Sequence, residues 1–308
     1  MNVFPTMITP YKSDGSLDIE TALSYVDFYF DSGMNGIFSV CQSSEIFYLS
    51  LEERVKLNHA VYTRAKELER KSGRKFTVVS SGHISETHEE QVKELNAIYE
   101  SGTDALILIT NRLDPENEGD DVFIERCERL ISELPGEARL GFYECPYPYK
   151  RLVTPRILEW CLSTNRFDYM KDTCCDAKQI AERCKILSGS SFKLLNANCQ
   201  TLLESLRQGC DGYCGIMCNF HPKLYAWLAD NFECDPRADI VQSVIGSLGF
   251  TEIGLPYPLS AKYHMTLRNI HTENIARNRS SSELTEYAKD CVKQMKYVTD
   301  ALEKQLGI

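Results

Sequence analysis

Short apolar segments alternate with longer amphipathic ones along most of the chain. The short segments are rich in β-branched and aromatic residues, as strands are, and the longer ones repeat apolar residues with a helical period. Strands are expected at residues 3–9, 36–41, 76–82, 105–110, 139–145, 166–172, 192–198 and 212–218. Helices are expected at residues 18–32, 51–70, 86–101, 122–134, 155–163, 177–187, 201–208 and 222–231. This alternation is typical of βαβ units and a parallel sheet.

Eight units of similar length favour a closed (β/α)8 TIM barrel over an open doubly wound sheet. The open sheet usually has fewer strands and a glycine-rich first turn, which this chain lacks. Residues 1–234 are therefore expected to form the barrel. Residues 235–308 are expected to form a C-terminal helical extension packed on it, because no low-complexity linker separates the two parts.

Charge and composition narrow the classes of ligand. Lys and Arg number 34 and Asp and Glu 44, and the net charge of −10 opposes nonspecific binding to nucleic acid or to anionic membranes. No window approaches the ~18 uninterrupted apolar residues of a membrane span, and the first residues do not resemble a signal peptide. The sequence therefore predicts a cytoplasmic protein with a small-molecule substrate.

Cysteines are numerous but do not form a metal-binding pattern. The chain has 13, scattered through apolar segments as reduced core cysteines would be. Cys174 and Cys175 are adjacent, and Cys210, Cys214 and Cys218 are spaced by four, but neither group has the paired C-x2-C spacing of a zinc site. We expect neither a structural metal nor a cofactor.

Lys171 lies at the carboxyl end of the sixth expected strand, the end at which barrel active sites lie. Strand alternation would place Phe167 and Tyr169 on the same face as Lys171, and Asp172 on the other. If that face lines the barrel, the amine lies above aromatic rings. Removal from water disfavours the charged amine, and a neutral amine can form a Schiff base with a carbonyl substrate. The alternative is a lysine that pairs with Asp172 or extends to the rim.

Tyr143 closes the fifth expected strand, next to the strand of Lys171. A tyrosine beside an amine can transfer protons while a carbinolamine forms and collapses. Gly141, two residues earlier, is expected to leave space beneath the ring. The alternative is a half-buried wall residue with no role in chemistry.

Several motifs, in order along the chain, resemble one enzyme family. The chain is similar to the dihydrodipicolinate synthase and N-acetylneuraminate lyase family of pyruvate-handling class I aldolases from residue 4 to about residue 270. The resemblance is carried by TPYKSDGSLD (9–18), SSEIFYLSLEER (43–54), YECP (143–146), MKDT (170–173) and PYPLSAKYHM (256–265). It implies a barrel enzyme that binds a 2-oxo acid such as pyruvate and forms a homo-oligomer, either a dimer or a tetramer.

The resemblance also assigns residues. Lys171 falls on the family's Schiff-base lysine, and Tyr143 on its proton-transferring tyrosine. The CQSSE loop (41–45) falls on the family's carboxylate-binding loop, so Ser43 and the backbone amides of Ser43 and Ser44 are expected to bind the substrate carboxylate. Gln42 occupies the place of a hydroxyl that relays protons in the family. Positions that line the family's pocket are occupied by Thr173 and Cys214.

Departures from the family separate this chain from its two best-known activities. Leu113 replaces a tyrosine that reaches into the partner subunit in dihydrodipicolinate synthases, and the segment 147–150 lacks their arginine for the second substrate. Cys199 and Gln200 replace an acidic pair of the sialic-acid lyases. Glu144 replaces a usual asparagine and is expected to point into the helix layer, where it needs a partner.

The leading hypothesis is therefore an aldolase or lyase that forms a Schiff base with pyruvate or a related 2-oxo acid. Its substrate would be of the 2-keto-3-deoxy acid type, with either aldol cleavage and condensation or dehydration as the reaction. Dihydrodipicolinate synthase or N-acetylneuraminate lyase proper are alternatives. A further alternative, supported by the altered loop at Gln42, is a non-catalytic protein that binds a 2-oxo acid.

Overall fold

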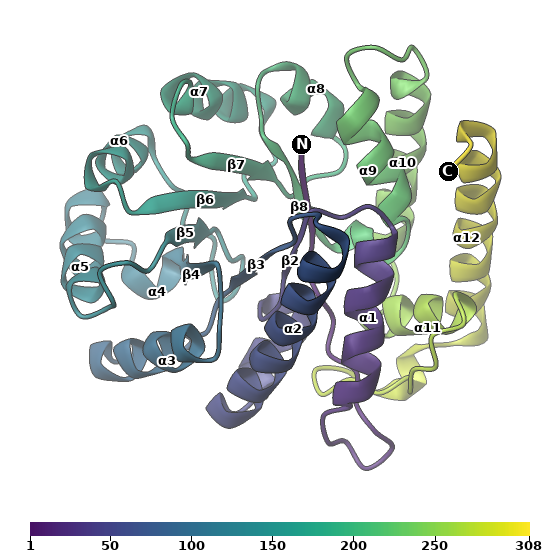
Figure 1. The fold of residues 1–308 in the computed structure, drawn as a ribbon, viewed down its shortest axis with the longest axis horizontal. Helices are drawn as coiled ribbons and strands as arrows, with labels where there is room; N and C mark the ends of the chain where they lie inside the picture. Colours follow the sequence, from purple (N-terminus) through teal and green to yellow (C-terminus); the bar gives the residue numbers. More distant parts are fainter.

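Eight parallel strands form the centre of the protein, whose computed structural model describes residues 1–308 (Figure 1). The strands are β1 (Asn2–Pro5), β2 (Gly36–Phe38), β3 (Thr77–Ser80), β4 (Ala105–Ile109), β5 (Leu140–Tyr143), β6 (Phe167–Asp172), β7 (Lys193–Asn196) and β8 (Gly212–Gly215). Their order in the sheet is β1-β8-β7-β6-β5-β4-β3-β2. A parallel bridge between Thr6 and Phe38 joins the two ends of the sheet. The predicted (β/α)8 TIM barrel is confirmed.

Helices surround the strands, and each follows its strand as the pattern predicted. They are α1 (Ile19–Asp31), α2 (Leu51–Ser72), α3 (His88–Glu100), α5 (Asp120–Ser132), α6 (Pro155–Thr164), α7 (Ala177–Leu187), α8 (Leu202–Arg207) and α9 (Pro222–Asn231). The sequence pattern missed short turns after the strands, which are α4 (Thr110–Leu113) and 3-10 turns at Gln42–Ser44, Ile46–Tyr48 and Ile216–Asn219.

Local capping explains where the helices begin and end. In α2, the Ser50 hydroxyl accepts a hydrogen bond from the Glu53 N–H (3.2 Å), and the Glu53 carboxylate accepts one from the Ser50 N–H (3.0 Å). This capping box satisfies two N–H groups that the helix itself leaves free. At the other end, Gly73 adopts a left-handed conformation with φ 72°, which a residue with a side chain rarely adopts.

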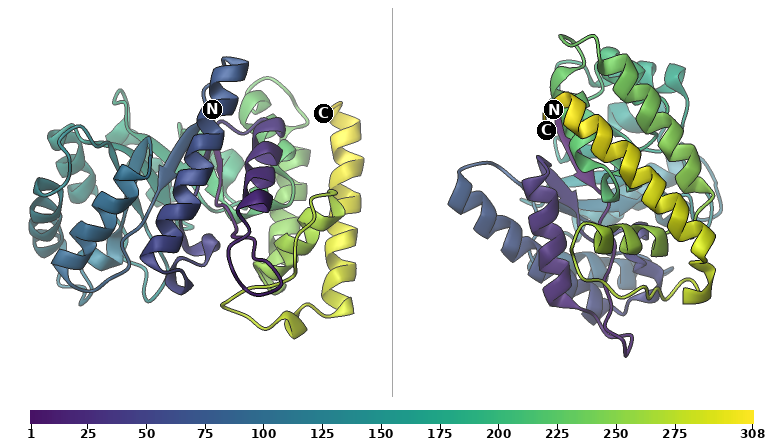
Figure 2. Two further views of the ribbon diagram at one scale, coloured as in Figure 1. Left: turned by 60° about the horizontal axis from the view of Figure 1, so that its bottom comes forward. Right: turned by 90° about the vertical axis from the view of Figure 1, so that its right-hand side faces the viewer.

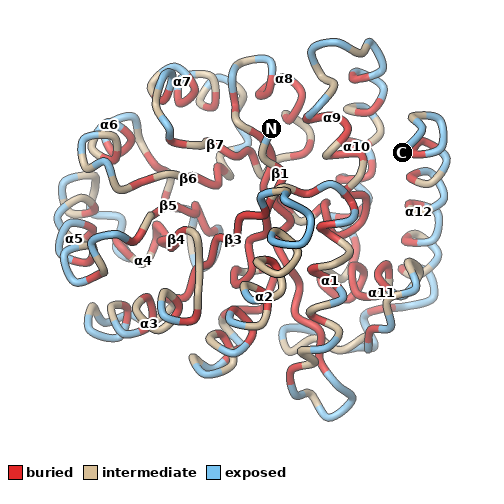
Figure 3. The backbone as a smooth tube through the Cα atoms, viewed as in Figure 1, coloured by how far each residue is buried: buried red, intermediate tan, exposed pale blue.

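Two layers of apolar side chains lie on either side of the strands. Most strand residues are buried, as the colouring of the backbone in Figure 3 shows. One layer fills the barrel lumen and includes Phe4, Phe38, Ile107, Tyr143 and Cys214. The other lies between the strands and the surrounding helices. Because both faces of the strands are covered, their sequences are nearly continuous apolar runs, as in other parallel sheets.

The remaining residues form α10 (Ala238–Ile253), α11 (Leu259–Leu267) and α12 (Glu286–Leu306). In Figure 2, α12 crosses the outer face of the molecule beside α11. One apolar cluster runs without interruption from β1 and α1 through α9 into all three helices. The C-terminal helical extension is confirmed, whereas the division into two domains at residue 234 stays a prediction. No helix combines the length and apolar character that crossing a bilayer requires.

One predicted orientation in β6 is wrong. Leu140 pairs with Phe167, but the next residue, Gly141, pairs with Tyr169, so β6 contains one extra residue at this point. Such a bulge reverses the faces on which the residues before and after it lie. Phe167 therefore packs in the outer layer against α6, while Tyr169 and Lys171 face the lumen.

Candidate active site

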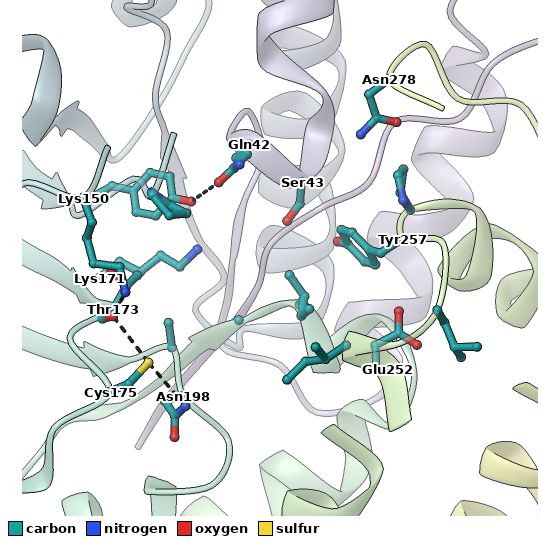
Figure 4. A pocket seen from close by; sticks show the side chains of 18 of the residues that line it. Gln42, Ser43, Lys150, Lys171, Thr173, Cys175, Asn198, Glu252, Tyr257 and Asn278 are labelled. Atoms are coloured by element: carbon teal, nitrogen blue, oxygen red, sulfur yellow. Dashed lines mark hydrogen bonds between the residues drawn. The ribbon is translucent and has the colours of Figure 1, made fainter. Parts of the chain in front are cut away.

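A cavity of about 500 Å³ opens at the carboxyl ends of the strands. It collects most of the residues that the sequence singled out, namely Gln42, Ser43, Tyr143, Lys171 and Thr173 (Figure 4). Volumes of this order are typical of small-molecule sites. The cavity therefore lies at the end of the barrel where the fold usually carries chemistry.

Lys171 extends from the end of β6 into this cavity and is 8% exposed. Its Nζ atom lies 4.2 Å from the centre of the Tyr143 ring and 5.8 Å from that of Phe38. The aromatic surroundings that the sequence predicted are present. The rings closest to the amine come from β5 and β2, and Tyr169 of β6 faces the lumen with Lys171 as predicted, whereas Phe167 does not. The alternative of an ion pair with Asp172 is wrong, because Asp172 lies on the opposite face of the strand and pairs with Arg183.

Tyr143 is 3% exposed, and its hydroxyl donates a hydrogen bond to Oε1 of Gln42 (3.1 Å). Burial raises the pKa of Tyr143 well above its ordinary value, so the phenol keeps its proton at neutral pH. It can therefore donate a proton to a neighbouring group, while the amide oxygen of Gln42 can only accept. The expected space beneath the ring is absent, because a Cβ atom at Gly141 would lie 2.6 Å from the δ-methyl group of Ile107.

The loop at residues 41–45 forms a tight 3-10 turn at the cavity wall. The Ser43 hydroxyl faces the cavity and donates to Oγ1 of Thr6 (3.0 Å). Ser44 does not line the cavity: its hydroxyl donates to the Met7 carbonyl (2.7 Å), and its N–H donates to the Cys41 carbonyl (3.0 Å). Ser44 therefore stabilises the turn that presents Ser43, and its amide is already engaged.

Thr173 and Cys214 each line a space that Lys171 also lines. Thr173 lines the cavity, but its hydroxyl donates to the Glu144 carbonyl (2.7 Å). Cys214 lies within the barrel lumen below the amine, where burial raises the pKa of the thiol to about 12. The apolar environment therefore keeps Cys214 a thiol, and it contributes packing beneath the lysine.

The three cysteines spaced by four diverge instead of converging. Cys210 packs between the strands and helices, Cys214 in the lumen and Cys218 in the cluster that reaches the C-terminal helices. No group of three or more His, Cys, Asp or Glu side chains is arranged to hold a metal ion.

A buried ionic cluster lies behind the Lys171 and Tyr143 pair. Arg183 of α7 donates to Glu144 (2.7 Å) and also to Asp172, and all three side chains are at most 1% exposed. Glu144 and Asp172 directly follow Tyr143 and Lys171, so alternation along each strand turns them into the helix layer. Burial raises the pKa of Glu144 above its ordinary value, and the Arg183 guanidinium opposes that effect. The cluster fixes the ends of β5 and β6 against α7.

Residues from the C-terminal region complete the cavity, and sequence reasoning missed them. Glu252, Tyr257, Asn278 and Arg279 all line it. The hydroxyl of Tyr257 accepts a hydrogen bond from the Asn219 amide (3.2 Å). The one signal in the sequence was Glu252 itself, a lone acidic residue between apolar segments and just before the PYPLSAKYHM motif.

Glu45 connects this C-terminal wall to the 41–45 loop. Its backbone is left-handed (φ 60°), and its carboxylate accepts hydrogen bonds from Lys262 Nζ (3.0 Å), the Arg277 N–H (2.6 Å) and the Asn278 N–H (3.2 Å). Lys262 and Glu45 are both fully buried, and burial lowers the pKa of Lys262 to about 8. This contact holds Asn278 beside the loop that carries Ser43.

The positions at which the chain departs from its relatives lie as follows. Leu113 is buried in the outer layer, Cys199 is buried, and Gln200 donates to the Gly246 carbonyl (3.3 Å). None of these three lines the cavity. Lys150 does line it, and its amine donates to the Thr173 carbonyl (2.7 Å).

The aromatic residues of the segment 147–150 lie outside the cavity. Tyr147 is half exposed and packs on the Phe47 ring, with a distance of 5.1 Å between ring centres. The Tyr149 hydroxyl donates to the Asp114 carbonyl. Of the segment 147–150, only Lys150 therefore lines the cavity, and these two rings do not.

Comparisons with known proteins point to one family. Residues 1–110 match the model of the dihydrodipicolinate synthetase family. The 4-hydroxy-tetrahydrodipicolinate synthase of Haloarcula marismortui is 24% identical over 98% of this chain and 95% of its own. The prophage protein YagE of E. coli K12, solved in complex with pyruvate, has a TM-score of 0.82 at 18% identity and covers 98% of both chains.

A second solved structure gives the same likeness. CdNal of Clostridium difficile, in complex with mannosamine, has a TM-score of 0.82 at 15% identity over 96% of this chain and 98% of its own. The fold, the motifs and these matches agree, and all of them indicate similarity to the dihydrodipicolinate synthetase family.

Proposed function

We propose that Lys171 forms a Schiff base with C2 of pyruvate or a related 2-oxo acid. The similarity to dihydrodipicolinate synthetases supports a class I aldolase or lyase activity. The observation that carries the assignment of Lys171 is that its amine ends in the cavity, 4.2 Å from the Tyr143 ring, with no carboxylate paired to it. An unpaired amine inside an enclosed site is available as a nucleophile.

The first step is the addition of Nζ of Lys171 to the C2 carbonyl. The carbonyl oxygen takes up a proton and the attacking nitrogen gives one up, which yields a carbinolamine. A second proton lets that oxygen leave as water, and the nitrogen lone pair forms the C=N bond of the iminium. Tyr143 is the group placed to pass these protons, because its phenol stays protonated and lies against the lysine. Ser43, across the cavity from Lys171, is placed to donate to the substrate carboxylate.

The iminium then accepts an electron pair from C3. In aldol cleavage the C3–C4 bond breaks, its electron pair forms an enamine, and the C4 hydroxyl loses its proton to leave an aldehyde. Protonation at C3 and hydrolysis return pyruvate and the free amine. In dehydration, C3 instead loses a proton and a hydroxyl group leaves from C4. A 2-keto-3-deoxy acid is a substrate for either course.

The non-catalytic alternative has one observation in its favour. Gln42 accepts the Tyr143 hydrogen bond, and an amide oxygen does not pass a proton onward as a hydroxyl does. A protein of this kind would bind the 2-oxo acid without turning over a longer substrate. The cytoplasmic location and the homo-oligomer stay predictions.

Borohydride reduction in the presence of pyruvate tests the proposal. We expect one reduced pyruvate moiety on Lys171, located by peptide mass mapping, and none on the variant Lys171→Arg. Release of pyruvate from 2-keto-3-deoxy sugar acids then separates an enzyme from a binding protein. An unmodified Lys171 after reduction with saturating pyruvate would overturn the assignment.

A further inference from the structure

A carboxyl group with no part in the Schiff-base steps lies in the same cavity. Glu252, in the last turn of α10, is 1% exposed and lines the cavity beside Ile253 and Leu255. Its Oε1 atom accepts a hydrogen bond from the Ser260 hydroxyl (2.8 Å), while Oε2 has no partner. Buried polar atoms are normally hydrogen-bonded, so an unpartnered oxygen at a cavity wall is placed to bind a molecule that enters.

The charge state of Glu252 limits what that molecule can be. No cationic side chain pairs with it, and burial raises its pKa to about 8, so the group is mostly protonated at neutral pH. Because Ser260 already donates to Oε1, the proton belongs on Oε2, where it can be donated to a ligand. A protonated carboxyl group both donates and accepts hydrogen bonds, as a hydroxyl group does.

The position of Glu252 limits the ligand further. Figure 4 shows Glu252 and Lys171 on opposite sides of the cavity, with Tyr257 next to Glu252. A three-carbon acid held at Lys171 leaves most of the 500 Å³ unfilled. The neutral polar side chains of Asn198 and Asn278 also line the cavity.

Cationic groups lie at the exposed rim and already have partners. The Lys150 amine donates to the Thr173 carbonyl (2.7 Å), and the Arg279 guanidinium pairs with Glu283 (2.7 Å). These two cationic side chains disfavour a ligand with a positive charge. Neither of them is a buried cation that could pair with a second carboxylate of the ligand. The interior of the cavity therefore fits a ligand whose carbon chain is uncharged beyond the 2-oxo acid group and carries oxygen atoms.

We infer that Glu252 is a specificity-determining residue that binds a hydroxyl group on the distal carbons of a polyhydroxylated 2-oxo acid, of the 2-keto-3-deoxy sugar acid class. The inference rests on the proposed function, because it places C2 of the substrate at Lys171. The competing structural explanation is that Glu252 only ties α10 to α11 through Ser260.

The test compares three acids that differ at their distal ends. Pyruvate, 2-oxohexanoate and 2-keto-3-deoxygluconate are each titrated against the wild type, Glu252→Leu and Glu252→Gln, and Schiff bases are trapped with borohydride. Mass mapping at Lys171 gives the half-saturating concentration, and the adduct mass distinguishes the intact six-carbon acid from any pyruvate released. Gln keeps a donor and an acceptor without charge, whereas Leu has neither.

We expect Glu252→Leu to raise the half-saturating concentration of 2-keto-3-deoxygluconate by roughly tenfold or more, which corresponds to the loss of one hydrogen bond to the ligand. The values for pyruvate and 2-oxohexanoate should change less than about twofold, and Glu252→Gln should restore most of the affinity for the hydroxylated acid. If Glu252→Leu lost the same affinity for all three acids, or lost none for any of them, the role of Glu252 would be overturned. The proposed function of Lys171 would not be affected. Failure of the wild type to trap pyruvate would overturn the proposed function and this inference together.

Discussion

Tyr143 and Lys171 occupy paired positions on the neighbouring strands β5 and β6, and the amine of Lys171 lies 4.2 Å from the centre of the Tyr143 ring. Because paired residues of parallel strands point to the same face, the register itself brings the proton donor to the amine. The residues that follow them, Glu144 and Asp172, are paired with one guanidinium on the other face. The register between β5 and β6 therefore places Tyr143 beside Lys171 on one face and the ion-paired carboxylates on the other.

Removal of the Tyr143 hydroxyl should slow the chemistry while leaving the fold intact. Tyr143→Phe keeps the ring against Lys171 and removes only the proton donor. We expect borohydride trapping of pyruvate to slow by roughly 10²-fold, and the free energy of unfolding to change by about 1 kcal/mol or less. Tyr147→Phe, at a half-exposed ring outside the cavity, is the control. Trapping at the wild-type rate would show that another group transfers the protons.

Loss of the buried cation should destabilise the protein strongly. Arg183→Met leaves Glu144 and Asp172 buried without a positive partner, which we expect to cost on the order of 3–5 kcal/mol in urea unfolding. The deficit should grow as pH rises, because burial already raises the pKa of Glu144 and its ionised form would then have no cation.

The matched control for Arg183→Met removes the charge of all three side chains. In Glu144→Gln/Asp172→Asn/Arg183→Met no buried group remains ionised, so this variant should recover most of the lost stability. If the single variant were as stable as the triple one, an uncompensated charge would not be the cause.

Neutralisation of Glu252 should stabilise the protein in a pH-dependent way. The pKa of Glu252 is raised from 4.5 to about 8 by burial, so between these values the folded chain binds a proton that the unfolded chain has released. The stability of the wild type therefore falls as pH rises through this window. Glu252→Gln has no such group, and its gain over the wild type should be absent below pH 4.5 and on the order of 3 kcal/mol at pH 7.

Unfolding at a series of pH values measures this difference. Glu159→Gln, at an exposed position of α6, is the control and should follow the wild type at every pH. A constant offset between Glu252→Gln and the wild type from pH 4 to pH 8 would mean that Glu252 ionises normally.

Loss of the Lys262 amine should weaken both the fold and the site. Lys262→Met leaves Glu45 fully buried without its cation, at an expected cost of about 3–5 kcal/mol in urea unfolding. Because Glu45 also holds Asn278 at the cavity wall, the half-saturating concentration of 2-keto-3-deoxygluconate should rise. Lys304→Met, at an exposed position of α12, should change neither value. An unchanged affinity for 2-keto-3-deoxygluconate would show that Glu45 does not position the cavity wall.

The alternation of apolar segments was enough to predict the barrel, because each strand of a parallel barrel is buried on both faces and each helix on one. It was not enough to predict orientations within β6. The bulge next to Gly141 moved Phe167 into the outer layer, and strict alternation cannot reveal an extra residue. The rings closest to the Lys171 amine came from β2 and β5, and of the two predicted rings only Tyr169 stayed on its face.

The pattern of apolar and polar residues also could not predict which residues from distant parts of the sequence contact one another. Glu144 was expected to need a partner, but nothing in the sequence singled out Arg183 among the charged residues of α7. Glu252 was missed for a similar reason, since a lone acidic residue near a helix end is common on protein surfaces. Only the packing of α10 over the barrel makes its carboxyl group part of the cavity.

The carboxylate of Glu45 joins a turn near the start of the chain to backbone amides more than two hundred residues later. During synthesis, a nascent chain that has left the ribosome as far as the eighth strand still lacks the C-terminal wall of the cavity. Truncations after the last strand are therefore expected to leave the cavity open on the side that Glu252, Tyr257 and Asn278 close, because the region that follows the barrel supplies that side.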